Sequence, residues 1–120
     1  RDFPSDPWHT GVDFAAPTGT PILSACDGIV LFRAQMPNGF GNYIVVYHGN
    51  YNGEAVATMY AHMSAFGDYK AGDRVSTGDV IGYVGSSGLS TGPHLHFQLH
   101  VGDTVRNPVD FFEFLSYLRP

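Results

Sequence analysis

The 120-residue chain contains little charge, one cysteine and no long apolar run. Charged residues make up 14% of the sequence, against roughly 25% in globular proteins, which disfavours long charged helices. Cys26 is the only cysteine, so an internal disulfide is impossible. Its apolar neighbourhood favours a buried, inert thiol over a catalytic one. No run of about 18 apolar residues occurs, so we expect no helix that spans a membrane.

A clustered basic face is also missing. The six Lys and Arg residues are scattered, and 11 Asp and Glu residues bring the net charge to -5. Proteins that bind nucleic acid usually carry a concentrated basic surface, so we expect no nucleic-acid partner.

Turn-forming residues are abundant instead, with 15 Gly and 8 Pro. Between them lie short apolar segments rich in β-branched and aromatic residues, which are typical of strands. The pattern predicts an all-β domain with strands near residues 21–25, 28–34, 43–48, 55–62, 80–84 and 95–101.

The two ends of the chain differ from this pattern. Residues 1–8 are polar and contain prolines, which predicts a linker or N-terminal loop. Residues 107–118 place Pro108 near the start and apolar residues at helical intervals, which predicts a short C-terminal helix. We therefore expect one domain over residues 9–120.

Six histidines are placed in informative positions. His9 and Asp13 are four residues apart, a spacing that puts both on one face of a helix or a strand. An imidazole and a carboxylate can both bind zinc, although this spacing alone often arises by chance.

The segment from His94 to Val101 alternates polar and apolar residues. In a strand, the polar set would share one face while the apolar set packs into the core. Imidazoles two residues apart would lie about 6 to 7 Å from each other, which suits one metal ligand and one neighbour of the metal. The alternative is a solvated polar face on an edge strand. The polar set is His94, His96, Gln98 and His100.

Two further histidines end predicted strands. Strand alternation places His62 on the same face as Tyr60, and a lone histidine there would usually be structural. His48 shares a face with the apolar residues Ile44 and Val46, which favours a structural role. Together, the histidine clusters offer enough groups for a zinc ion with three protein ligands and an open position, with histidines to spare for acid–base chemistry.

Three motifs in this order resemble the signature motifs of the M23 metallopeptidase family, which includes lysostaphin and LytM. They are His9-x-Gly11-x-Asp13, Tyr60-Ala61-His62 and His94-x-His96. The text between them is also typical of the family, and the resemblance covers residues 9 to 112. It departs from the family in two places: no tyrosine shortly precedes His9, and Gln98 stands where many relatives have glutamate.

The resemblance implies a site and a fold. His9, Asp13 and His96 would bind one Zn²⁺ ion, while His62 and His94 would be the catalytic histidines. The fold would consist of antiparallel sheets of the duplicated hybrid motif type, with a groove walled by four loops. Those loops would lie near residues 1–8, 34–42, 49–54 and 85–93. Trp8, Phe40 and Tyr60 are candidates for the aromatic walls of the groove or for packing, while Gln98 and His100 are candidates to support the metal ligands.

The resemblance further implies a zinc endopeptidase that hydrolyses peptide bonds in the stem peptides or cross-bridges of bacterial peptidoglycan. The alternative is a non-catalytic module on the same scaffold that binds cell walls or activates a hydrolase. A carrier domain of the biotinyl or lipoyl type would need a lysine at a hairpin tip, where none occurs. We expect a secreted or cell-envelope location, a monomer without membrane insertion, and a targeting domain elsewhere in the full-length protein.

Overall fold

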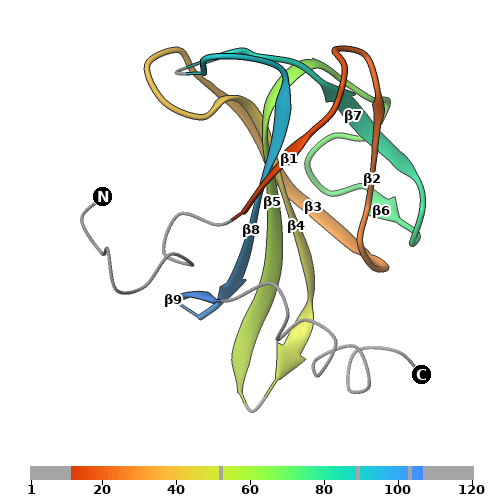
Figure 1. Ribbon diagram of the computed structural model, residues 1–120. Helices are drawn as coiled ribbons and strands as arrows, with labels where there is room; N and C mark the ends of the chain where they lie inside the picture. The colour runs from red at the N-terminus through yellow and green to blue at the C-terminus, as the bar shows by residue number, and fades with distance from the viewer. Residues whose placement is uncertain (1–11, 52, 89, 103, 107–120) are drawn as a thin grey trace.

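A computed structural model describes residues 12–51, 53–88, 90–102 and 104–106. Within these residues nine strands form one sheet in which every paired neighbour is antiparallel (Figure 1). The strands are β1 (Val12–Ala15), β2 (Pro21–Leu23), β3 (Gly28–Met36), β4 (Gly41–Tyr51), β5 (Glu54–Phe66), β6 (Arg74–Val75), β7 (Val80–Val84), β8 (His94–Val101) and β9 (Thr104–Arg106).

This architecture confirms the all-β antiparallel prediction. The described residues contain no helix, and therefore none that is long and apolar enough to cross a membrane. The predicted linker at 1–8 and the predicted helix at 107–118 lie outside the described residues.

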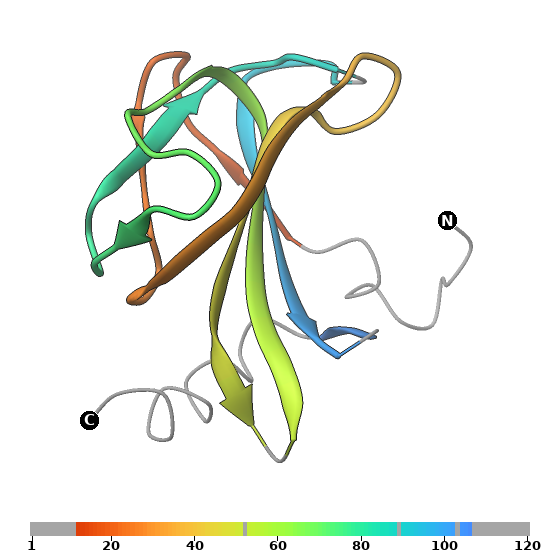
Figure 2. The same ribbon diagram turned by 180° about the vertical axis from the view of Figure 1, so that it is seen from behind.

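The long strands run in the order β1-β8-β5-β4-β3-β6, while β2 pairs with β7 and β9 pairs with β8. The β4–β5 hairpin is the longest feature, and its tip projects away from β2, β6 and β7 in both ribbon views (Figures 1 and 2). The loop predicted at 49–54 is therefore mostly strand, because Gly49 pairs with Val56 and Tyr51 with Glu54. This segment cannot wall a site near His62, which lies toward the other end of β5.

β5 changes partner near its end. Up to Ala61 it pairs with β8, and from Met63 onward it pairs with β7. The register with β4 also shifts here, since Asn42 pairs with Met63 while Ile44 pairs with Tyr60. His62 lies at this break and is the only non-glycine residue with a positive φ in the described part of the chain, at 61°.

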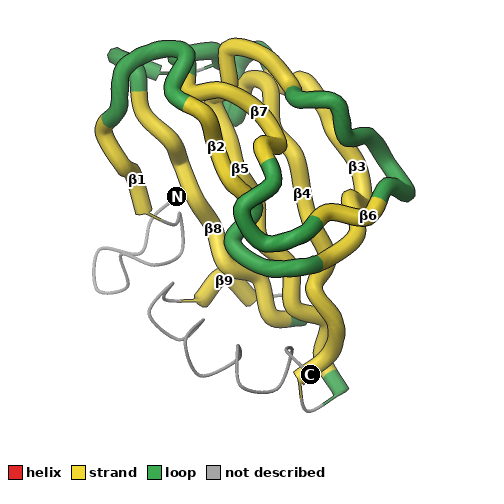
Figure 3. Tube along the Cα trace, turned by 90° about the vertical axis from the view of Figure 1, so that its right-hand side faces the viewer, coloured by secondary structure: helices red, strands yellow, loops and turns green. Residues whose placement is uncertain are grey.

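The main core is enclosed because the sheet curls, so that β2, β6 and β7 face β3, β4 and β5 (Figure 3). Its buried members come from all six of these strands: Ile22, Val30, Ile44, Val46, Tyr60, Met63, Val75, Ile81 and Val84. A second cluster holds Cys26, Val56, Leu99 and Val101, and Cys26 is a buried free thiol, as expected.

β8 has the two faces that the alternation predicts. Leu95 and Phe97 pack against the main core and Leu99 lies within the second cluster. On the opposite face, His96 pairs across the strands with Ala61 and Gln98 with Met59. The edge-strand alternative is wrong, because β8 lies between β1 and β5 and both His96 and Gln98 are buried.

Candidate metal and catalytic site

β1 and β8 bring Asp13 and His96 together across 83 residues of sequence. The two residues are direct cross-strand partners, and His96 Nδ1 donates to Asp13 Oδ1 at 2.7 Å. His94 Nε2 lies 3.6 Å from the same oxygen. The Asp13 side chain is 63% exposed, whereas those of His94 and His96 are 19% and 11% exposed. The carboxylate therefore stands at the mouth of a site whose imidazoles lie deeper.

His62 joins this cluster from β5. Its ring centroid lies 4.8 Å from that of His94 and 5.9 Å from that of His96. The main-chain N–H of His62 donates to the carbonyl of Phe40 at 2.8 Å, which holds the break in β5 against the β3–β4 loop. Three of the histidines singled out from the sequence thus converge with Asp13.

The prediction that Tyr60 and His62 share a face is wrong. Tyr60 is buried in the main core, where its hydroxyl accepts from the N–H of Ala25 at 3.0 Å. The left-handed φ of His62 breaks the alternation of β5, so His62 turns to the side of Ala61 and His96. Tyr60 is therefore a packing residue and does not line the site.

Main-chain carbonyls of the 85–93 loop orient both predicted catalytic histidines. His62 Nδ1 donates to the carbonyl of Ser87 at 2.7 Å, and His94 Nδ1 donates to the carbonyl of Gly92 at 2.8 Å. A carbonyl only accepts, so each Nδ1 carries the proton and each Nε2 keeps a lone pair when the ring is neutral.

Loss of hydration on burial lowers the pKa of His62, although its bond to Ser87 opposes the shift. His62 is thus a neutral proton acceptor at pH 7.

Gln98 and His100 lie behind His96. The Gln98 side-chain amide lies 3.0 Å from His96 Nε2 and 2.9 Å from His100 Nε2. Gln98 therefore contacts the predicted metal ligand His96 directly. Of these three residues, His100 contacts Gln98 and not His96. Burial lowers the pKa of His100.

Phe40 forms an aromatic wall of the site. Its ring stacks on His96 with centroids 5.7 Å apart and an angle of 22° between the planes. It also lies 6.5 Å from the ring of His62. Of the three aromatic candidates, Phe40 lines the site, Tyr60 does not, and Trp8 lies outside the described residues.

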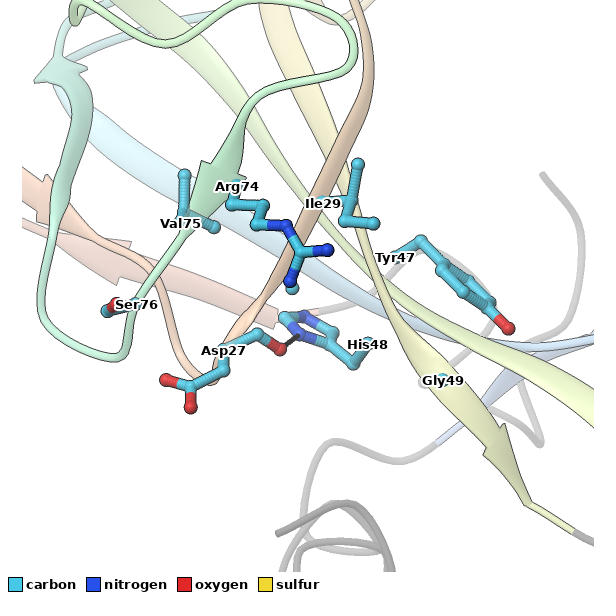
Figure 4. Close-up of a pocket in the computed structure, with 9 residues that line it drawn as sticks. Asp27, Ile29, Tyr47, His48, Gly49, Arg74, Val75 and Ser76 are labelled. Atoms are coloured by element: carbon cyan, nitrogen blue, oxygen red, sulfur yellow. Dashed lines mark hydrogen bonds between the residues drawn. The ribbon is translucent and has the colours of Figure 1, made fainter. Parts of the chain in front are cut away.

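His48 is apart from this cluster and has a structural environment, as predicted. Its Nδ1 bonds to the carbonyl of Asp27 at 2.8 Å, and its Nε2 bonds to Thr58 Oγ1 at 2.7 Å. His48 lines a cavity of about 350 Å³ together with Asp27 and Arg74, and the three side chains are drawn in Figure 4. Of the predicted site residues that the structure describes, none (Asp13, His62, His94 or His96) lines that cavity.

Two of the three predicted metal ligands lie in the described part of the chain. Asp13 and His96 supply a carboxylate oxygen and an imidazole nitrogen, both of which are ordinary zinc donors. Two ligand atoms at tetrahedral positions around zinc lie about 3.3 Å apart. His96 Nδ1 and Asp13 Oδ1, now 2.7 Å apart, would need to separate only slightly to bind one ion. The described residues alone do not form a group of three His, Cys, Asp or Glu side chains that holds a metal. The predicted third ligand, His9, lies outside them, and the two described donors fit zinc.

Sequence reasoning did not single out Ser87 or Gly92. Both contribute a main-chain carbonyl, a group that every residue carries, so residue type gives no signal for this role. The glycine-rich, serine-rich composition of residues 85–93 indicated a loop but not its acceptors.

Comparison with known proteins gives consistent results. The sequence profile of "Peptidase family M23" matches residues 7–108. The DD-carboxypeptidase/endopeptidase Mpg of Neisseria meningitidis is 46% identical over 101 residues, 84% of this chain and 22% of that protein. The glycyl-glycine endopeptidase ALE-1 of Staphylococcus capitis is 37% identical over 113 residues, 91% of this chain and 30% of that protein. The chain thus spans less than a third of the length of either relative.

Solved structures of similar sequence have the same fold. The catalytic domain of the antimicrobial peptidase lysostaphin from Staphylococcus simulans has a TM-score of 0.76 at 37% identity, covering 88% of this chain and 79% of that one. A zinc-containing peptidase from Vibrio cholerae has a TM-score of 0.74 at 37% identity, covering 82% and 28%. With its profile match, its all-β antiparallel sheet and its cluster of Asp13, His62, His94 and His96, this chain belongs to peptidase family M23.

Proposed function

We propose that this domain is a zinc-dependent endopeptidase that hydrolyses peptide bonds in bacterial peptidoglycan, within stem peptides or cross-bridges. The observation that carries the proposal is the convergence of two zinc donors, Asp13 and His96, with two imidazoles oriented by main-chain carbonyls. The names of relatives support the substrate class, since ShyA of Vibrio cholerae is a peptidoglycan DD-endopeptidase and ALE-1 is a glycyl-glycine endopeptidase.

Asp13, His96 and His9 would hold one zinc ion. When bound there, zinc supplies Lewis acidity, which polarises a peptide carbonyl and acidifies water. The described residues provide the proton transfer. His62 and His94 each have Nδ1 bonded to a carbonyl, so the lone pair of either Nε2 accepts a proton from the attacking water.

The same geometry supports the second half of the reaction. After it accepts the proton, the ring is an imidazolium whose Nε2–H donates to the departing amine and restores the neutral base. The carbonyl acceptors at Nδ1 keep the ring in one orientation through both steps, since an N–H at Nδ1 is present in both protonation states. This retained acid–base pair favours an enzyme over the non-catalytic module.

The proposal is tested by incubating the zinc-loaded domain with peptidoglycan of defined cross-links and identifying the released peptides by mass spectrometry. The matched controls are the His94→Ala variant and the wild-type domain treated with a chelator. We expect release of peptides by the wild type, loss of release in both controls, and recovery of the chelated sample on addition of zinc. Failure of the zinc-loaded wild type to release any peptide would reject the enzyme and favour a binding module. Unchanged release by His94→Ala would remove His94 from the mechanism.

We propose a secreted or cell-envelope location, because the proposed substrate lies outside the cytoplasm. The net charge of -5 disfavours electrostatic attraction to an anionic wall, so we also propose that another part of the full-length protein targets it. If this domain binds intact walls as tightly as the full-length protein does, the targeting proposal is wrong.

A further inference from the structure

The side chain and main chain of Ser87 connect three segments at the catalytic site. Its carbonyl accepts from His62 Nδ1 at 2.7 Å. Its hydroxyl donates to the carbonyl of Met63 at 2.6 Å and accepts from the N–H of Asn42 at 3.0 Å. One residue of the 85–93 loop is thus bonded to β4, to β5 and to the ring of a predicted catalytic histidine.

The hydroxyl of Ser87 occupies the break in the sheet. Asn42 and Met63 are register partners at the point where the β4–β5 pairing shifts. The N–H of Asn42 bonds to Ser87 Oγ, and its side-chain amide bonds to the carbonyl of Met63 at 3.0 Å. Met63 directly follows His62 in the chain. The hydroxyl of Ser87 therefore links the Ser87 carbonyl, which accepts from the His62 ring, to the main chain next to His62.

Gly41 and Gly88 allow the main chain of the 85–93 loop to contact the start of β4 beside Ser87. Gly41 has a φ of 64°, and a Cβ there would lie 2.4 Å from the Ser87 main chain. Gly88 has a φ of 75°, and a Cβ there would lie 2.3 Å from the nitrogen of Gly41. The 85–93 loop is therefore pressed against the start of β4, beside a cavity of about 310 Å³ lined in part by Asn42, Ser87 and Gly88.

We propose that Ser87 is a positioning residue for the reaction: its hydroxyl holds the loop so that its carbonyl keeps the proton of His62 on Nδ1. This inference rests on the proposed function and deepens it. Without the hydroxyl, the N–H of Asn42 loses its acceptor and the carbonyl of Ser87 is no longer tied to Met63. His62 then populates the tautomer with the proton on Nε2, which has no lone pair to accept a proton at the reacting centre.

The test compares Ser87→Ala with Ser87→Thr, which retains the hydroxyl, and with Ser64→Ala. Ser64 is an exposed residue one position after Met63, and its hydroxyl contacts only the carbonyl of Tyr83 among the described residues. Three quantities are measured on the zinc-loaded chain: the His62 tautomer by ¹⁵N NMR at pH 7.5, the bound zinc, and kcat and KM on a cross-linked muropeptide.

In Ser87→Ala we expect the Nε2–H tautomer of His62 to appear and kcat to fall about 10- to 100-fold, as misplacement of a catalytic group does. KM should stay within about twofold of wild type and one equivalent of zinc should remain bound. Ser87→Thr and Ser64→Ala should resemble the wild type in all three measurements. If Ser87→Ala does not fold, Ser87→Cys carries the test, because a thiol is a weaker hydrogen-bonding group in the same place. For this variant we expect a smaller shift in tautomer and a smaller fall in kcat.

An unchanged tautomer in the folded Ser87→Ala or Ser87→Cys variant would overturn the proposal. So would a fall in activity that comes with loss of zinc, because that pattern indicates general damage to the site. The tautomer measurement needs no substrate. A wild type that cleaves nothing therefore contradicts the proposed enzyme, while the link between Ser87 and His62 is still decided by the NMR result.

Discussion

His48 and His62 are two buried histidines with similar surroundings and different uses. Their exposed fractions are 8% and 6%, and burial lowers the pKa of each. Each ring bonds through Nδ1 to a main-chain carbonyl, Asp27 at 2.8 Å for His48 and Ser87 at 2.7 Å for His62. The first nitrogen therefore does not distinguish them.

The other ring nitrogen, Nε2, distinguishes His48 from His62. Nε2 of His48 bonds to Thr58 Oγ1 at 2.7 Å, and that hydroxyl continues to Tyr60 at 2.8 Å, so the ring is enclosed in a polar network. Nε2 of His62 has no hydrogen-bond partner among the described residues, and its ring faces His94 and His96. A buried histidine is available for catalysis when the fold leaves one nitrogen unpaired toward a reacting centre.

The largest expected difference between replacing His62 and replacing His48 is in kcat. His62→Ala should lower kcat by about 10² to 10⁴, the usual contribution of a general acid–base group, with zinc still bound. His48→Ala should leave the kcat of the folded protein within about threefold of wild type, because the ring nitrogens of His48 bond to Asp27 and Thr58, outside the cluster. Peptide release is measured with zinc content checked in each variant. Equal losses of kcat would abolish the distinction.

Asp13 tests whether the open cluster is a metal site. Asp13→Ala should weaken zinc binding more than about 100-fold, since even residues behind the ligands contribute 10- to 100-fold. The measurement is competition with a chromophoric chelator. The matched control is Asp27→Ala, which removes a carboxylate bonded to Thr77 near His48 and should retain zinc. Wild-type affinity in Asp13→Ala would remove this carboxylate from the ligand set.

For folding stability, replacing His48 should have a larger effect than replacing His62, the reverse of the order expected for kcat. His48→Ala should lower the free energy of unfolding by about 2 kcal/mol, because the buried hydroxyl of Thr58 and the carbonyl of Asp27 each lose a hydrogen bond. His62→Ala should cost less, since only the Ser87 carbonyl loses its donor. Urea unfolding of the two variants measures both values. A larger loss in His62→Ala would show that the site histidine also supports the fold.

The smallest effect is the pH dependence of stability. Because burial lowers the pKa of His48 in the folded state, the unfolded chain binds more protons once the pH falls below the ordinary value of 6.5. The free energy of unfolding should therefore decrease as the pH drops from 6.5 toward the folded-state pKa, by at most about 1.4 kcal/mol per pH unit for this residue. His62 and His100 contribute in the same direction.

His48→Gln removes one titrating group and should flatten this dependence without abolishing it. Unfolding curves at pH 7.5, 6.5 and 5.5 for the wild type and the variant provide the measurement. An identical slope in both proteins would mean that His48 is not held neutral by its network.

Several features were predictable because they depend on local patterns. The alternation from His94 to Val101 predicted the two faces of β8, and short apolar segments with turn residues predicted an antiparallel all-β fold. Asp13, His62, His94 and His96 were identified by motif and are brought together in the structure. The loop near 49–54 was misjudged because its glycines and asparagines form part of a continuous hairpin.

The strand pattern, the donor chemistry and the candidates for catalysis could be read from the amino-acid sequence, since periodicity and side-chain type are local properties. The three-dimensional fold was needed to show that Tyr60 faces the core while His62 faces the site, because one left-handed residue breaks the alternation. It also decided what each ring nitrogen of His48 and His62 contacts. That choice depends on carbonyls and hydroxyls from distant segments, and a hydrogen-bond partner far along the chain leaves no periodic trace in the sequence.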